Sequence, residues 1–75
     1  MINLCKFCKL QGYSKEEYKN IVNNINTLSD ALINEHFSND AYYTITEIEE
    51  KLKEISLDTH KFYPYILNKI VEKLY

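Results

Sequence analysis

The clearest pattern in the chain is a stripe of apolar residues that starts near residue 18. Its members recur at steps of three and four residues, which places them on one face of an α-helix. This spacing predicts an amphipathic helix over residues 15–37. The stripe consists of Tyr18, Ile21, Val22, Ile25, Leu28, Leu32 and His36.

The start of this helix is marked by a capping box. The Ser14 hydroxyl is placed to accept from the Glu17 backbone N–H, and the Glu17 carboxylate to accept from the Ser14 N–H. Gly12 comes just before the box, where a glycine in the left-handed conformation often ends a preceding helix. We therefore expect a short first helix over residues 3–11.

A second capping box, at Thr44 and Glu47, predicts another helix start. The turn-forming residues 38–40 separate it from the long helix. The strand propensity of residues 42–46 leaves a short strand, paired across a dimer, as the alternative. Four apolar residues at helical spacing predict a helix over 45–56, and they are Ile45, Ile48, Leu52 and Ile55.

The last segment contains Pro64, which is tolerated in the first turn of a helix but not in its interior. We therefore expect a helix over 62–75, after a turn or short helical entry over 58–61 with Asp58 or Thr59 as the cap. One kinked helix from Thr59 is the alternative. The apolar side of this helix is formed by Ile66, Leu67, Ile70, Val71 and Leu74.

The scarcity of glycine and proline supports a helical fold. The 75 residues include one glycine and one proline. β-Hairpins need residues with positive φ at tight turns, and glycine usually supplies them. We therefore expect a single domain, residues 1–75, that folds as an all-α bundle of three to four helices.

The charged residues bear on the kind of partner. The formal charge is −2, and all nine basic residues are lysine. Arginine is the usual reader of phosphates and guanine edges, so a nucleic-acid partner is less expected than a protein partner. No apolar run has the length of a membrane span. The start of the chain lacks the pattern of a secretory signal, and two cysteines make no disulfide framework, so we expect a cytoplasmic protein.

Cys5 and Cys8 are the candidate metal ligands, because residues three apart share one side of a helix. A structural zinc site needs four ligands, and the chain has no second CxxC motif. A redox role would need a βαβ context that the pattern lacks. Cysteine also packs as a small apolar side chain, and we expect that role here, with no cofactor.

The residues that carry catalysis elsewhere form no recognisable constellation. The sequence around His36 is not the HExxH motif of zinc proteases. Glu35 and His36 are adjacent on the predicted helix, where neighbouring side chains are expected to diverge. A single glycine cannot form a glycine-rich phosphate loop. We therefore expect no enzymatic activity.

Tyrosine, which occurs seven times, gives the best indication of a binding surface. Its side chain offers a large contact area and is enriched at interface hot spots. We expect Tyr42, Tyr43, Tyr63 and Tyr65 to contact a partner, with half-burial at the core edge as the alternative. Two asparagines on the polar side of the long helix are further candidates, namely Asn20 and Asn23.

These features favour a small, non-catalytic protein-binding module, such as an inhibitor of a host protein encoded by a phage or mobile element. A bacteriocin-immunity-like bundle is one alternative, since those proteins are small helical bundles. A helix-turn-helix DNA-binding regulator is another, because the helices over 45–56 and 62–75 have roughly that layout. That half of the chain is not basic, which disfavours phosphate binding. A homodimer is expected if one chain cannot cover its long apolar stripe.

Overall fold

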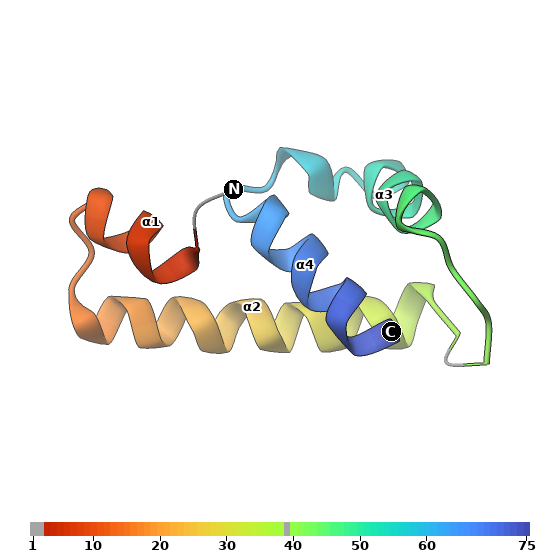
Figure 1. Cartoon of the computed structure of the whole chain (residues 1–75), viewed down its shortest axis with the longest axis horizontal. Coiled ribbons are helices and arrows are strands. Elements are labelled where there is room, and N and C mark those ends of the chain that lie inside the picture. The colour runs from red at the N-terminus through yellow and green to blue at the C-terminus, as the bar shows by residue number, and fades with distance from the viewer. Residues whose placement is uncertain (1–2, 39) are drawn as a thin grey trace.

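The computed structural model describes residues 3–38 and 40–75, and within that part the regular structure is entirely helical (Figure 1). Met1 and Ile2, at the start of the chain, lie outside the described residues, as does Asn39 of the expected turn. The all-α bundle is therefore confirmed. Its elements are α1 (Leu4–Leu10), α2 (Lys15–His36), α3 (Ile45–Glu54), the 3-10 turn η1 (Leu57–Thr59) and α4 (Tyr63–Leu74).

The long helix α2 is the spine of the molecule, and α1, α3 and α4 lie along one side of it (Figure 1). The predicted capping box starts α2, since Ser14 Oγ accepts from the Glu17 N–H at 3.1 Å and Glu17 Oε1 accepts from the Ser14 N–H at 2.9 Å. Gly12 has a φ of +81°, so the chain leaves α1 in the left-handed conformation that was expected there.

The second capping box starts α3. Thr44 Oγ1 accepts from the Glu47 N–H at 3.1 Å, and Glu47 Oε1 accepts from the Thr44 N–H at 3.0 Å. The helix ends two residues earlier than expected, because Ser56 adopts a left-handed φ of +62° and the chain then enters η1. No strand occurs at residues 42–46 or elsewhere in the described ranges of this single chain, and Ile45 and Thr46 belong to α3.

The prediction that Asp58 or Thr59 caps the last helix is wrong. The Thr59 hydroxyl donates instead to the Ser56 carbonyl at 2.9 Å. Phe62 occupies the cap position of α4 without a side-chain cap bond, and its N–H donates to His60 Nδ1 at 3.0 Å. Pro64 then falls in the first turn of α4, as expected, where its missing N–H leaves no helical bond unmade.

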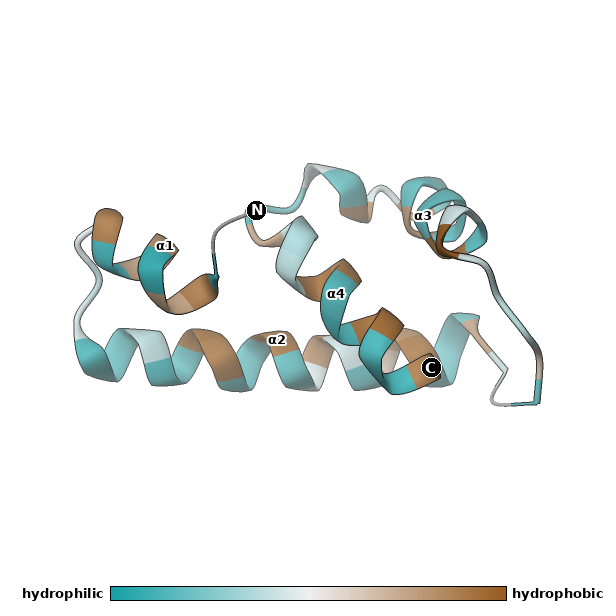
Figure 2. Ribbon diagram, in the orientation of Figure 1, coloured by the Kyte–Doolittle hydropathy of each residue, from teal (hydrophilic) through white to brown (hydrophobic). Residues whose placement is uncertain are grey.

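The core lies between α2, α3 and α4. Its four completely buried aliphatic side chains, from α3 and α4, are Ile48, Leu52, Ile66 and Ile70, and α2 adds Ile25, Leu32 and Ile33. Figure 2 shows the hydrophobic positions of α2 along the stretch that α4 crosses.

Two apolar residues in the predicted stripe of α3, Ile45 and Ile55, are more exposed than the pattern predicts. Ile45 is 48% exposed and Ile55 is 36% exposed. Ile45 precedes the first buried position of α3, and Ile55 follows its last helical residue. Neither side chain lies in the stretch that packs on α4 and α2, so the buried face of α3 reduces to Ile48 and Leu52.

Candidate functional site

Two tyrosines stand out at the end of the molecule where α2 ends and α4 ends. Tyr42 is 85% exposed and Tyr75 is 65% exposed. They line one open hollow of about 350 Å³ together with Ala41, Tyr43 and Leu74. We call these five residues the tyrosine surface. It combines two exposed aromatic side chains with an open hollow of mixed polar and apolar lining, and tyrosine is enriched at interface hot spots.

Tyr43 holds this surface in place. Its hydroxyl accepts from the Ser38 N–H at 2.9 Å, and its ring packs edge-on against the buried Phe37 ring, with centroids 5.2 Å apart. Its carbonyl accepts from the Tyr75 hydroxyl at 2.8 Å. The loop before α3 is thereby fixed to both α2 and the end of α4, and it displays Tyr42 outward from a supported backbone.

The structure does not bring the four predicted tyrosines to one surface. Tyr42 and Tyr43 share the tyrosine surface, whereas Tyr63 lines a different hollow beside α3. The pKa of Tyr63 is raised, first by burial and then by the nearby Glu49 and Asp58 carboxylates. Tyr65 packs against the Phe7 ring, with centroids 5.7 Å apart.

Tyr75 is the residue that the sequence reasoning missed. It lies four residues after Val71 and so continues the apolar spacing of α4, which predicts a packed ring rather than an exposed one. Its proximity to Tyr43 is a tertiary contact between residues far apart in the chain.

The asparagines expected to bind a partner are exposed on α2, and neither Asn20 nor Asn23 lines one of the hollows described for this part of the chain. Asp30, another exposed polar residue of α2, has a structural role. Asp30 accepts from Lys73 Nζ at 2.6 Å, which ties α2 to the last turn of α4.

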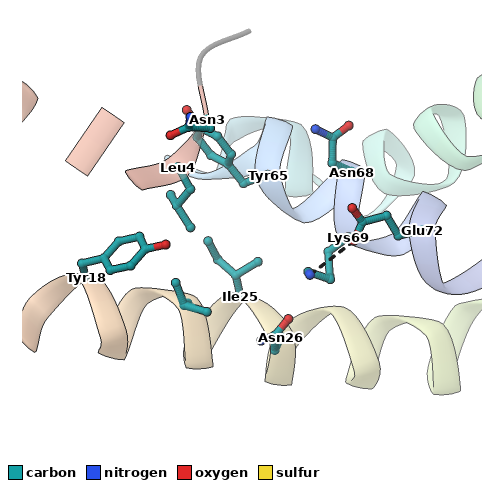
Figure 3. Close-up of a pocket in the computed structure, with 10 residues that line it drawn as sticks. Asn3, Leu4, Tyr18, Ile25, Asn26, Tyr65, Asn68, Lys69 and Glu72 are labelled. Carbon is teal, nitrogen blue, oxygen red and sulfur yellow. Dashed lines mark ion pairs between the residues drawn. The ribbon is translucent and has the colours of Figure 1, made fainter. Parts of the chain in front are cut away.

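A second concave region is the groove between α1, α2 and α4 shown in Figure 3, with a volume of about 410 Å³. Apolar side chains form its floor, and its amide-bearing rim offers both donors and acceptors. Lys69 Nζ and Glu72 Oε2 pair across one edge at 3.3 Å, so the charges there largely cancel. The lining residues come from the start of α1 (Asn3 and Leu4), from α2 (Tyr18, Val22, Ile25 and Asn26) and from α4 (Tyr65, Asn68, Lys69 and Glu72).

The two cysteines lie on α1, and Cys8 is only 1% exposed. Burial raises the pKa of the Cys8 thiol, Cys5 raises it further, and Lys61 lowers it. Within the described ranges no group of three or more His, Cys, Asp and Glu side chains could hold a metal ion. A buried, protonated thiol of this kind packs as a small apolar group.

The histidines occupy separate structural positions. The expectation that Glu35 and His36 diverge is wrong, since His36 Nε2 lies 3.7 Å from Glu35 Oε2. His60 uses its Nδ1 to accept from the Phe62 N–H at the entry to α4. The contact between Glu35 and His36 is an ion pair only when the imidazole is protonated. The bond between His60 and the Phe62 N–H fixes the backbone at the entry to α4.

The layout of α3 and α4 differs from a tight helix-turn-helix. Residues 55–62, which include η1, lie between the two helices, whereas that motif uses a turn of three or four residues. No helix in the described part of the chain is both long and apolar enough to cross a membrane.

Comparisons with protein-family models, with curated proteins and with solved structures gave no match. The functional interpretation of these surfaces therefore depends on their own geometry and chemistry.

Proposed function

We propose that this chain is a small, non-catalytic protein-binding module whose partner covers the tyrosine surface. The observation that carries the proposal is the pairing of two highly exposed tyrosines, Tyr42 and Tyr75, around one concave floor. An aromatic side chain left in water is unfavourable, and its burial by a partner contributes strongly to binding. Tyr43 supports the same loop from within, so little ordering entropy is lost when the partner binds.

The size and charge of the chain fit an inhibitor encoded by a phage or mobile element, acting in the cytoplasm on a host protein. A short helical chain blocks another protein by covering its surface, which requires a rigid patch rather than catalytic groups. The bonds that join α2, the loop before α3 and α4 around Tyr43 provide that rigidity.

The test is affinity capture with the tagged chain in extracts of the source cells. We expect one protein to be enriched in stoichiometric amount by the unaltered chain and lost with the double variant Tyr42→Ser and Tyr75→Ser. The matched control is the double variant Asn20→Ser and Asn23→Ser, which alters two exposed side chains of α2 away from the tyrosine surface. Circular dichroism checks that both variants keep their helical content.

Equal capture by the unaltered chain and the tyrosine double variant would remove the tyrosine surface from the proposal. If the enriched protein is the chain itself, sedimentation equilibrium distinguishes a homodimer, and the double variant is then expected to be a monomer. Capture of duplex DNA instead, with an affinity that falls steeply as salt rises, would contradict the proposal in favour of a DNA-binding regulator.

A further inference from the structure

Charge is distributed unevenly along the chain. Residues 1–15 contain three lysines and no acidic residue, whereas all eleven acidic residues lie within residues 16–75. The three are Lys6, Lys9 and Lys15. The first turn of α2 adds Glu16 and Glu17 at the same end, so residues 1–19 contain four lysines and two carboxylates, and this end keeps a net positive charge although the chain as a whole is acidic.

Lysines from three segments meet at this end. Lys9 of α1 and Lys15 of α2 line a hollow of about 340 Å³, whose walls are formed by Cys5, Cys8, Tyr13 and Tyr18. Lys61, from the connection before α4, contacts the Tyr13 hydroxyl through its Nζ. That Nζ also lies 5.0 Å from the centroid of the Tyr13 ring. We call this hollow with its three lysines the lysine pocket.

The protein itself leaves these charges largely uncompensated. Among the described residues, neither Lys9 nor Lys15 forms an ion pair. Glu17, at the start of α2, already accepts from the Ser14 N–H in the capping box. Glu16 is exposed in the same first turn, where a carboxylate is favoured by the helix dipole. The lysine pocket thus combines an apolar interior with an excess of positive charge.

We propose that the lysine pocket binds an acidic peptide segment of a partner protein. One apolar side chain of the segment enters the hollow between Tyr13 and Tyr18, and carboxylates on either side pair with Lys9, Lys15 and Lys61. The volume of the hollow accommodates a side chain of the size of leucine or phenylalanine. The apolar contact supplies affinity, and the lysines select the acidic sequence and speed its approach.

A protein segment fits this end of the molecule better than other anions do. A nucleic acid extends beyond a single pocket, and its phosphates would meet the acidic remainder of the chain. Lysine also lacks the bidentate geometry that makes arginine the preferred phosphate ligand. A lipid bilayer presents a broad surface, whereas a concave hollow fits a protruding side chain. Among the described residues of α1, Leu10 is the one large apolar side chain that is highly exposed, at 69%. The helix therefore does not present a row of apolar side chains to a bilayer.

The test is fluorescence anisotropy with a labelled synthetic peptide that carries one phenylalanine between two pairs of glutamates. We expect saturable binding at low salt, and the double variant Lys9→Gln and Lys15→Gln to weaken it about tenfold, since two such ion pairs together contribute about 1.4 kcal/mol. The matched control is Lys51→Gln and Lys53→Gln on α3, which makes the same change of charge away from the pocket and leaves binding nearly unchanged. A peptide with glycine in place of phenylalanine should bind several-fold more weakly.

Equal weakening by the two lysine double variants would overturn the proposal, because binding would then reflect net charge alone. Equal binding of the glycine peptide would also overturn it. So would tighter binding of duplex DNA, or of vesicles of anionic phospholipid, that is lost with the Lys9 and Lys15 variant. The tyrosine surface lies near the opposite end of α2 (Figure 1), so the Tyr42→Ser and Tyr75→Ser variant should bind the peptide normally. The two proposals can therefore fail independently.

Discussion

Ser29 shows how one polar residue can be hidden in an apolar face. It is completely buried on α2, four residues from both Ile25 and Ile33, and its hydroxyl has no hydrogen-bond partner among the described residues. Residues four apart lie on the same side of a helix, so Ser29 faces the core with these isoleucines. The periodic pattern could not identify it, because a serine at that position reads as a gap in the apolar stripe.

We predict that Ser29→Ala stabilises the protein by about 1 kcal/mol, because it removes a buried hydroxyl that gives up water without gaining a partner. Urea denaturation measures the change. Thr27→Ala is the control, since Thr27 is exposed on the same helix and the substitution alters helix propensity by only about 0.5 kcal/mol. A loss of stability in Ser29→Ala would mean that the hydroxyl has a partner, such as a buried water.

The tyrosines illustrate what a single sequence does not determine at this scale. Tyr42 and Tyr65 belong to the same predicted set, but Tyr42 is exposed while Tyr65 packs on the Phe7 ring. Their environments depend on where α1 and the loop before α3 lie, and helical spacing contains no information on either. The residue type indicated a binding role, and only the tertiary fold separates a free ring from a packed one.

At the scale of the helices, local signals placed the starts of α2 and α3 accurately. Both capping boxes form with the predicted partners, because the interaction involves only residues three apart. The start of α4 was predicted to within one residue, but its cap was not predicted. Its entry depends on the His60 ring and on η1, and a histidine side chain accepting from the backbone two residues later has no established pattern in sequence.

The capping boxes should make stability depend on acid pH. The pKa of Glu17 and the pKa of Glu47 are both lowered. The chief cause is the hydrogen bond that each carboxylate accepts from the backbone N–H of its cap residue, Ser14 or Thr44, and the second is the hydrogen bond with the side chain of the same residue. A carboxylate whose pKa is lower in the folded state stabilises the fold above its unfolded pKa, near 4.3, and loses this effect as the pH falls through the folded value. We expect the double variant Glu17→Gln and Glu47→Gln to lose less stability between about pH 5 and pH 3 than the unaltered chain.

The measurement is the urea midpoint at a series of pH values. Glutamine can take the same place in a capping box, so the helices should persist in the variant. The control is Glu16→Gln and Glu50→Gln, two exposed carboxylates that take part in neither box. An unaltered acid response in the first variant would show that other carboxylates dominate it.

Substitutions at Gly12 test the backbone conformation of the connection between α1 and α2. Its φ of +81° is unfavourable for other residues, and a Cβ added there would meet no atom within 4 Å. The cost of Gly12→Ala is therefore a backbone cost, of about 1 kcal/mol. Gly12→Asn should cost less, since asparagine tolerates the left-handed conformation better. Urea denaturation of both variants measures the difference, and an equal effect would contradict this explanation.

For the molecule as a whole, the sequence predicted the helices but not how firmly each is attached. The core cluster of the described residues consists of side chains from α2, from its cap residue Phe37, and from α3 and α4. The helix α1 has no residue in this cluster, but Leu4 packs against it, and the Phe7 ring contacts Phe62 and Tyr65, with centroids 5.8 and 5.7 Å apart. A seven-residue helix is too short to be stable in water by itself. Its folding should therefore depend on these ring contacts.

We predict that Phe7→Ala releases α1 while the rest of the protein stays folded. Hydrogen exchange should show lost protection for the amides of α1 and retained protection around Ile48 and Ile70, which are completely buried in the core. Ile66→Ala is the matched comparison. It removes a completely buried side chain between the main helices and should cost about 2–5 kcal/mol, so protection should fall throughout the molecule. If Phe7→Ala also lowered protection around Ile48 and Ile70, α1 would be part of one cooperative unit, because local release leaves those core amides unaffected.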